Sequence, residues 1–439
     1  MARVASSLVA GTSAAGPSAS YRSVFAVREF RTLFAGQFMY VLGFEFEILG
    51  LSVLVYARTG SSLWAALAFS AGFAPQAVSG AFLTSLADRL PPRAAISGSL
   101  LVRAFPGLVI GLAPGMPIPL TLVVVAAAAL VTPVFLASNS GLLPELLEGD
   151  RYVLGRSVFS LVSAGTQIAG LGLAGVLLAV LPAPGLMLLA GGSLTVSALV
   201  MRLGLRHRPA RADRVGGGGS GSASGKGARG VARATLAGNR ELLASPRLRR
   251  LLLMQWLPAW FASGAEALIV PYTESLGRPA GAASLLLASV PCGMLVGDVV
   301  VGRLCPPGVR ERLVLPLALL VGVPLLGFAF RPSLALAAVL LFASGTGFAY
   351  SVGLQRAFAE AIPERLRGQG FGLASTGLMG GQGLLPTAFG GVGTVLGPAG
   401  AIASAGAAVA AAALLTNWRM SNDPASADRY RVSIHTEST

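Results

Sequence analysis

Two glutamates stand in the middle of an apolar run near the start of the chain. Residues 36–56 read GQFMYVLGFEFEILGLSVLVY, and Glu45 and Glu47 lie at the centre of this run. On insertion scales a charged residue at the centre of a membrane-spanning helix costs about 2.5–3.5 kcal/mol, so its presence there indicates a function. The chemistry that such carboxylates suggest is reversible proton binding, coupled to a change in water access.

Helical periodicity separates the two glutamates. At about 100° per residue, Glu47 shares a face with small and polar residues, whereas Glu45 lies on the opposite face. The face that contains Glu47 consists of Gly36, Tyr40, Gly43, Glu47, Gly50 and Leu54. We therefore expect the two carboxylates to have different surroundings and different roles.

A second apolar run repeats this spacing around Glu266. The repeated face consists of Gln255, Ala259, Ala262, Glu266, Ile269 and Thr273. One carboxylate on a small-residue face in each half of the chain favours a functional pair. The alternative is that each glutamate makes a structural hydrogen bond to a Ser, Gln or Arg of a neighbouring helix.

The composition indicates that these residues are carried by an integral membrane protein. Of the 439 residues 54% are hydrophobic and only 12% are charged, which leaves too little charge to cover a soluble domain of this size. Cys292 and Cys305 would lie roughly 20 Å apart on a helix, so neither a disulfide nor a metal site is implied. His207 and His435 fall in polar segments, and no nucleophile–base set appears, so we expect no enzymatic activity, no metal and no cofactor.

The apolar runs are long enough for twelve membrane-spanning helices of about 20 residues each. The expected spans are 32–57, 62–86, 94–113, 118–142, 156–181, 184–204, 250–271, 281–302, 313–330, 333–355, 368–390 and 395–417. The predicted fold class is thus an all-α membrane protein with twelve helices in two bundles of six.

The basic residues support this topology. With the N-terminus in the cytoplasm, 29 Lys and Arg residues fall on the cytoplasmic side, three fall outside, and Arg103 lies within a span. Cytoplasmic loops carry such an excess of positive charge, so the net charge of +15 needs no nucleic-acid partner. We expect a multi-pass protein of the plasma membrane with both termini in the cytoplasm.

A glycine- and serine-rich segment divides the chain. Residues 215–230 read VGGGGSGSASGKGARG, a flexible-linker composition. The expected domains are a disordered N-terminal tail (1–31), a first bundle (32–204), a flexible cytoplasmic loop (205–246), a second bundle (247–418) and a C-terminal tail (419–439). FRTLFAGQF (30–38) and LRRLLLMQW (248–256) are similar, which indicates an internal repeat of six spans and aligns Gln37 with Gln255.

Over residues 28–418 the chain resembles the major facilitator superfamily. ADRLPPR (87–93) resembles its loop motif Gly-x-x-x-Asp-Arg-x-Gly-x-Arg-Arg, although Thr84 and Pro91 replace its glycines. LLPELLEGDR (142–151) and IPERLRGQGFGL (362–373) resemble the segments after the fourth span and before the eleventh. Together these segments resemble the branch of drug, siderophore and macrolide exporters.

The resemblance assigns expected roles to particular residues. Asp88, Arg89 and Arg93 would form a cytoplasmic latch, which Asp298 and Arg303 would join in the second half unless they form only a local ion pair. GLGLAG (170–175) matches the antiporter motif of the fifth span at Gly170 and Gly175 but lacks its proline, which leaves close helix packing as the other reading.

In that fold the first span borders a central cavity, so the face with Glu47 would line it. Glu47 and Glu266 would then be the cavity carboxylates, while Glu45 would pack against helices or pair with a cation. The remaining candidates for the cavity lining are Gln37, Tyr40, Gly43, Gln255 and Tyr350. Arg103 would either extend to the membrane surface or pair with Glu45 or Glu47.

The function expected from this resemblance is export of an amphipathic or lipophilic small molecule by proton antiport. The proton gradient would be the energy source, and the protein would act as a monomer in the lipid bilayer. An uptake symporter of the same fold and a non-transporting membrane sensor or scaffold stay open as alternatives.

Overall fold

The computed structural model describes residues 20–83, 89–147, 150–210, 228–279 and 281–421. Within these ranges all regular secondary structure is helical. In the first part of the chain the helices are α1 (Tyr21–Phe25), α2 (Arg28–Thr59), α3 (Ser62–Ala71), α4 (Ala74–Leu83), α6 (Pro92–Leu112), α7 (Ile118–Ala129), α8 (Thr132–Leu146), α9 (Asp150–Leu178) and α10 (Ala183–Gly204). They are followed by α12 (Ala228–Ala244), α13 (Pro246–Glu266), α14 (Ile269–Ser275), α15 (Gly281–Val299), the π-helix η1 (Val300–Leu304), α16 (Pro307–Arg312), α17 (Val314–Leu326), the 3-10 turn η2 (Gly327–Phe330), α18 (Leu334–Gly347), α19 (Tyr350–Ala361), the 3-10 turn η3 (Glu364–Leu366) and α20 (Arg367–Ser421).

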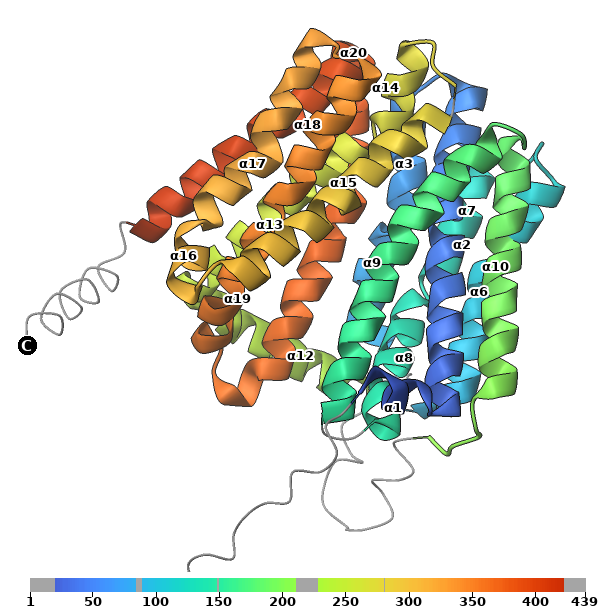
Figure 1. Ribbon diagram of the computed structural model, residues 1–439, viewed down its shortest axis with the longest axis vertical. Helices are drawn as coiled ribbons and strands as arrows, with labels where there is room; N and C mark the ends of the chain where they lie inside the picture. The colour runs from blue at the N-terminus through green and yellow to red at the C-terminus, as the bar shows by residue number, and fades with distance from the viewer. Residues whose placement is uncertain (1–19, 84–88, 148–149, 211–227, 280, 422–439) are drawn as a thin grey trace, which may run out of the picture.

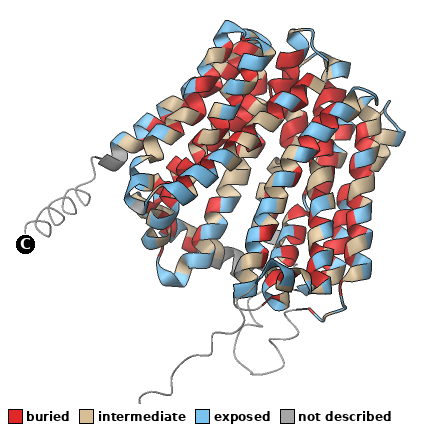
Figure 2. Ribbon diagram, in the orientation of Figure 1, coloured by how far each residue is buried: buried red, intermediate tan, exposed pale blue. Residues whose placement is uncertain are grey.

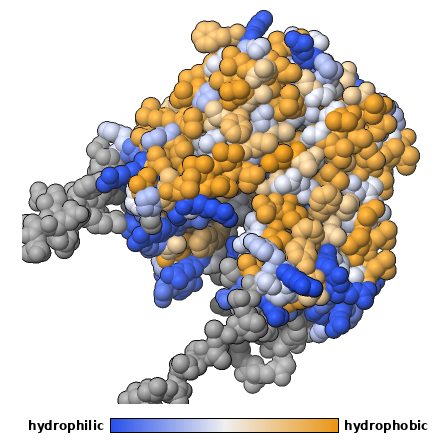
Figure 3. All heavy atoms as spheres, in the orientation of Figure 1, coloured by the Kyte–Doolittle hydropathy of each residue, from blue (hydrophilic) through white to orange (hydrophobic). Residues whose placement is uncertain are grey.

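The expected class, an all-helical membrane protein with many apolar spans, is confirmed. In the described part of the chain eight helices are long and apolar enough to cross a membrane, and a shorter apolar one covers Val314–Phe330. The surface view agrees, because apolar residues cover most of the visible face and hydrophilic residues gather at its lower edge (Figure 3).

Several expected spans are broken into two helices. The spans at 62–86, 118–142, 250–271 and 333–355 become the pairs α3/α4, α7/α8, α13/α14 and α18/α19. Pro75 and Pro133 lie in the first turn of α4 and α8, where the missing proline N–H breaks no helical hydrogen bond. The eleventh and twelfth expected spans form α20, which bends at Gly397. The φ angle of this residue is 74°, a conformation that glycine adopts more easily than other residues.

The helices form two groups that stand side by side (Figure 1). In the first group α10 packs against α2 and α6; in the second α20 packs against α13 and α17, and α15 packs against α18. We name the two ends of the molecule after α12 and α14, which lie at its lower and upper ends in Figure 1. The groups meet where α9 contacts α15 and where α3 and α4 contact α20.

The contacts between the groups gather towards the α14 end. Gly175, near the end of α9, lies against Gly281 and Ser284 at the start of α15. Further along, Gly390 of α20 lies against Ala66 of α3, and Gly383 lies against Ala74 of α4. These residues lie in the halves of their helices that point to the α14 end, so the two groups are closely packed there.

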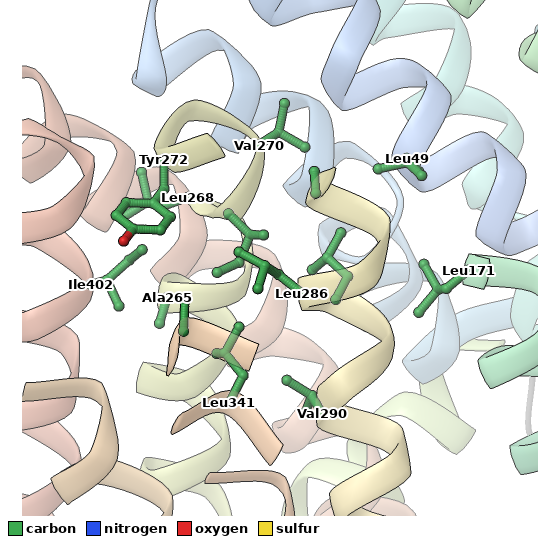
Figure 4. Packing of buried hydrophobic residues seen from close by; sticks show 14 of the residues in the cluster. Leu49, Leu171, Ala265, Leu268, Val270, Tyr272, Leu286, Val290, Leu341 and Ile402 are labelled. Carbon is green, nitrogen blue, oxygen red and sulfur yellow. The ribbon is translucent and has the colours of Figure 1, made fainter. Parts of the chain in front are cut away.

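A buried apolar cluster fills this junction. It joins Leu49 of α2 and Leu171 of α9 to Leu268, at the break between α13 and α14, and to Leu286 of α15. Figure 4 shows Leu49 and Leu171 approaching α15 from the first group. The buried residues run through the interior of both groups, while the outer faces of the helices are exposed (Figure 2). Apolar burial therefore holds the groups together at the α14 end.

The segment between the groups is more ordered than its composition suggested. The sequence predicted a flexible loop over 205–246, but residues 228–244 form α12, and residues 211–227 lie outside the described ranges. Gln369 of α20 donates to the carbonyl of Thr235 and to Asn239, and Arg365 forms an ion pair with Glu241. The expectation of a loop is therefore wrong for α12, which is attached to the second group.

The start of the same segment is attached to the first group. Arg208 donates two hydrogen bonds of 2.7 Å to the carboxylate oxygens of Glu29, and the backbone N–H of Arg206 donates a third of 2.8 Å. Such bidentate charge-assisted pairs are among the stronger polar contacts in proteins. The segment is thus fixed to both groups by its described parts. The domain boundaries derived from the sequence stay a prediction.

Close packing between α15 and α18 yields a first prediction. A Cβ added at Gly293 would overlap the carbonyl oxygen of Phe342 and meet the amide nitrogen of Thr346, both of them backbone atoms. We expect Gly293→Ala to lower the free energy of unfolding by about 1–3 kcal/mol, because the helices must move apart. Thermal unfolding of the purified protein, followed by tryptophan fluorescence, measures this change.

Gly192→Ala is the matched control, since nothing lies within 4 Å of an added Cβ at that position. This variant should unfold at the wild-type temperature or slightly above it, because alanine favours the helix over glycine. Equal unfolding temperatures for both variants would contradict the assigned packing.

Candidate functional site

Glu47 is neutralised by an arginine inside the first group of helices. Arg103 of α6 donates a hydrogen bond of 3.0 Å to a carboxylate oxygen of Glu47, and their side chains are 1% and 3% exposed. The guanidinium also lies 5.8 Å from the ring centroid of Phe44, a cation–π distance. Among the described residues, Nε and Nη1 of Arg103 have no hydrogen-bond partner. The pair is therefore a buried structural contact between α2 and α6.

The small-residue face around Glu47 does not line a cavity between the groups, which corrects the expectation from the sequence. Gly36 contacts Met201, Gly43 contacts Ala190 and Leu194, and Gly50 contacts Met187, all of them on α10. Glycines on this face let the backbones of α2 and α10 approach closely, as small residues do in membrane helices. The face is used for packing within the first group.

Glu45 lies where the sequence placed Glu47, at the junction of the two groups. Its side chain is 5% exposed and has the Gln167 side chain of α9 as a hydrogen-bond partner. Glu266 of α13 is close enough to act on it electrostatically. Gly170 of α9 lies against the Glu45 side chain, so this glycine makes room for it. The positions expected for Glu45 and Glu47 are thus exchanged, while their roles in coupling stay a prediction.

Glu266 stands at the break in the seventh span. It is the last residue of α13, and the next residues, Ala267 and Leu268, contact the first group. Ala267 packs with Ala66 and Phe69 of α3. Glu266 is half-buried as a residue, whereas Glu45 is buried. One carboxylate from each group therefore lies beside the apolar cluster at the junction.

The other residues expected to line the cavity are mostly buried in packing contacts. Tyr40 packs against Phe135, with ring centroids 4.5 Å apart. Tyr350 is buried and donates a hydrogen bond of 2.9 Å to the carbonyl of Gln255, whose side chain is half-buried. Gly43 lies against α10. In this structure Gly43, Tyr40 and Tyr350 are therefore in packing contacts, and their place in a substrate cavity stays a prediction.

Gln37 belongs to a polar network that the sequence did not reveal. Asn139 of α8 donates a hydrogen bond of 3.0 Å to Oε1 of Gln37, and Nε2 of Gln37 donates one of 3.2 Å to Ser163 of α9. The network joins three helices of the first group near the α12 end. The available signal was the polar pair Ser138–Asn139 inside an apolar span.

Two stacked tryptophans face the eleventh span. The rings of Trp256 and Trp260 are almost parallel, with centroids 5.7 Å apart. Their indole N–H groups donate to the carbonyls of Ala374 and Gly377, at 2.8 and 3.0 Å. Gly377 and Gly381 provide the space for the two rings. The tryptophans therefore fix α13 to α20.

The latch residues are only partly described by the structure. Asp88 lies outside the described residues, Arg89 is exposed and Arg93 is half-buried. Asp298 and Arg303 are exposed, and within the described ranges no ion pair joins them. Instead Arg310 donates to the carbonyls of Cys305 and Gly302 at the end of η1. Among the described residues, no group of three His, Cys, Asp or Glu side chains is placed to hold a metal.

Apolar spanning helices in two packed groups, with buried ionisable residues within and between the groups, are the organisation of a membrane transporter. The model of the Major Facilitator Superfamily matches residues 33–386 of the sequence. The chain therefore belongs to this superfamily and is a secondary transporter rather than an enzyme. No match was found among curated protein sequences.

Solved transporter structures share this fold. A POT family transporter in complex with a thioalcohol-conjugated peptide is similar with a TM-score of 0.66 at 12% identity, over 88% of this chain and 95% of that one. A bacterial homologue of the human lysosomal transporter Spinster, in an inward-facing and occupied conformation, has a TM-score of 0.63 at 15% identity, over 93% and 98% of the chains. A bacterial homologue of the iron transporter ferroportin in an inward-facing state has a TM-score of 0.63 at 15% identity, over 89% of this chain and 97% of that one.

The Glu47–Arg103 pair gives a prediction on stability. Arg103→Met leaves the Glu47 carboxylate buried without its counter-ion, and we expect the free energy of unfolding to fall by about 3–5 kcal/mol. The double variant Arg103→Met/Glu47→Leu should recover most of this loss, because it buries no uncompensated charge. Thermal unfolding in detergent measures both effects.

Arg202→Met provides the control, since Arg202 is exposed near the end of α10 in the same group. It should unfold at about the wild-type temperature. A double variant that is less stable than Arg103→Met would show that the two side chains do not compensate each other.

Proposed function

We propose that the protein exports an amphipathic or lipophilic small molecule in exchange for protons. The observation that carries this proposal is the position of Glu45 and Glu266, one from each group, beside the apolar junction at the α14 end. The resemblance to drug, siderophore and macrolide exporters in LLPELLEGDR and IPERLRGQGFGL supports export.

Repulsion between the two carboxylates explains how proton binding would be coupled to movement of the two groups of helices. Two ionised carboxylates in a low-dielectric junction repel each other, and this repulsion works against packing of the groups at the α14 end. Protonation of either carboxylate removes the repulsion, so the junction closes. Loss of the proton favours separation of the groups at that end.

The direction of transport follows from the side of the membrane to which the site is open in each state. In the proposed cycle the substrate enters from the α12 end while the α14 end is closed, and the carboxylates lose protons towards the same side. The groups then separate at the α14 end, where the substrate leaves and protons bind. Each cycle moves protons inward and substrate outward, which is antiport.

We propose an orientation of the protein in the membrane that agrees with the distribution of its basic residues. The protein acts as a monomer in the plasma membrane, and residues 32–204 and 247–418 rock against each other. The α12 end and both termini lie in the cytoplasm, because 29 basic residues fall on that side. Substrate export then runs from the α12 end to the α14 end.

The carboxylates give the test of coupling. Glu45→Gln and Glu266→Gln should each reduce transport driven by a pH gradient by roughly tenfold or more, because the change of charge at the junction is lost. Exchange of labelled substrate without a gradient should fall as well, because glutamine resembles the protonated carboxylate and keeps the α14 end closed. Proteoliposomes with an imposed pH gradient, assayed with a panel of lipophilic compounds, provide the measurement.

Glu274→Gln is the matched control, because Glu274 is an exposed carboxylate of α14. It should transport like wild type. Gradient-driven transport by Glu45→Gln at the wild-type rate would contradict the role of this residue.

The direction of transport needs its own experiment. Inverted membrane vesicles with an acidic interior should accumulate the exported compound, because protons leave the vesicle as substrate enters. Gradient-dependent accumulation in intact cells would instead show uptake, and the proposal of export would be wrong.

A further inference from the structure

A cavity of about 380 Å³ opens between α8 and α9 in the first group. Its polar lining consists of Asn139, Ser140, Arg156, Ser160 and Ser163. Three hydroxyls, an amide and a guanidinium converge here, although the neighbouring parts of these helices are largely apolar. Such a concentration of hydrogen-bonding groups in a cavity of this size is typical of a small-molecule site.

Arg156 is the only charged residue that lines this cavity. Within the described ranges no carboxylate forms an ion pair with it. A guanidinium carries five N–H donors and binds planar oxyanions with two of them at once. The cavity therefore offers a positive charge that the described part of the protein does not compensate.

Asn139 belongs to the wall of the cavity and is fixed there by the network of Gln37. Its side chain is buried, at 5% exposure, and Nδ2 is held by Oε1 of Gln37. The other amide atom, Oδ1, is buried without a partner among the described residues.

The hydroxyl of Ser163 is positioned by the same network. It accepts the hydrogen bond from Nε2 of Gln37, so its own hydrogen is free to turn towards the cavity. Ser160 lies one helical turn earlier on α9, and Arg156 lies one turn before that. The three donors therefore follow one face of α9 along the cavity.

Apolar side chains complete the cavity beside these donors. Leu143, Tyr152 and Phe159 also line it. An aromatic and aliphatic surface next to a charged end suits an amphipathic molecule, whose apolar body packs while its polar end is hydrogen-bonded.

We infer that this cavity is the subsite for the anionic end of the substrate, where Arg156 and the serine hydroxyls bind a carboxylate or another oxyanion. This inference rests on the proposed function, because it assigns a substrate class to the transporter. Arg156 supplies the charge, Ser160 and Ser163 supply neutral donors, and Tyr152 and Phe159 contact the apolar body. An amphipathic organic acid is thus the preferred substrate class.

Equilibrium binding to the full-length protein in lipid nanodiscs tests the inference without a gradient. Calorimetric titrations with 2-naphthoate, its uncharged isostere 2-naphthamide, and 2-naphthylmethylammonium compare an anion, a neutral molecule and a cation of similar size. We expect naphthoate to bind about tenfold tighter than naphthamide, as a charge-assisted hydrogen bond requires. Titration with 2-naphthylphosphonate distinguishes a carboxylate site from a site for oxyanions in general.

Arg156→Gln should abolish this preference, so that naphthoate and naphthamide bind alike. The control Arg151→Gln removes an exposed arginine of the same helix that does not line the cavity, and it should keep the preference. Asn139→Asp adds a carboxylate to the lining and should weaken naphthoate binding about tenfold while strengthening binding of the ammonium probe. This variant also provides the test if Arg156→Gln does not fold.

Equal binding of naphthoate and naphthamide to the wild type would overturn the inference, as would tighter binding of the ammonium probe. A preference for naphthoate that persists in Arg156→Gln and in Asn139→Asp would overturn it as well. An Arg156-dependent preference without gradient-driven transport would leave the subsite standing and overturn the proposed antiport. The two proposals can therefore fail separately.

Discussion

The cost of keeping charge in a low-dielectric interior governs the polar architecture of this transporter. The charge of Glu47 is compensated by an ion pair with Arg103, and both side chains are almost completely buried. Glu45 and Glu266 have no cationic partner among the described residues, and Glu266 acts electrostatically on Glu45. In the proposed function this pair is the element that switches with proton binding. A carboxylate with a fixed counter-ion is suited to holding helices together.

Glycines let the helices pack closely enough to place these charged side chains. Gly36, Gly43 and Gly50 bring α2 against α10, and this packing places Glu47 among the helices of the first group, where Arg103 reaches it. Gly170 leaves space for the Glu45 side chain between α2 and α9. The position of each carboxylate is thus decided by the backbone distance between helices, which small residues set.

The sequence predicted the spans and the family because these depend on local composition. Runs of apolar residues and the distribution of arginine need no knowledge of neighbours. The breaks before Pro75 and Pro133 were not predicted, although each proline stands where a helix can begin. Helical phase showed that Glu45 and Glu47 lie on opposite faces, but it could not show which helix each face meets. The approach of Glu45 to Glu266, and the network of Gln37 with Asn139 and Ser163, join distant segments and required the fold. Residues 228–244 were hidden by the adjacent glycine-rich stretch, although they contain many good helix formers.

The junction at the α14 end is built so that it can open at a limited cost. Its contacts are largely apolar side chains and glycine backbones, such as Gly175 against Gly281, and these lose no hydrogen bond when they separate. Ser70 and Thr387 share a hydrogen bond of 2.9 Å across the groups, and both hydroxyls can bind water or a neighbouring carbonyl once they are apart. Apolar burial alone would favour the closed state at every stage of a cycle. In the proposed cycle a controllable repulsion balances it, and the only carboxylates that the described structure brings together across this junction are Glu45 and Glu266.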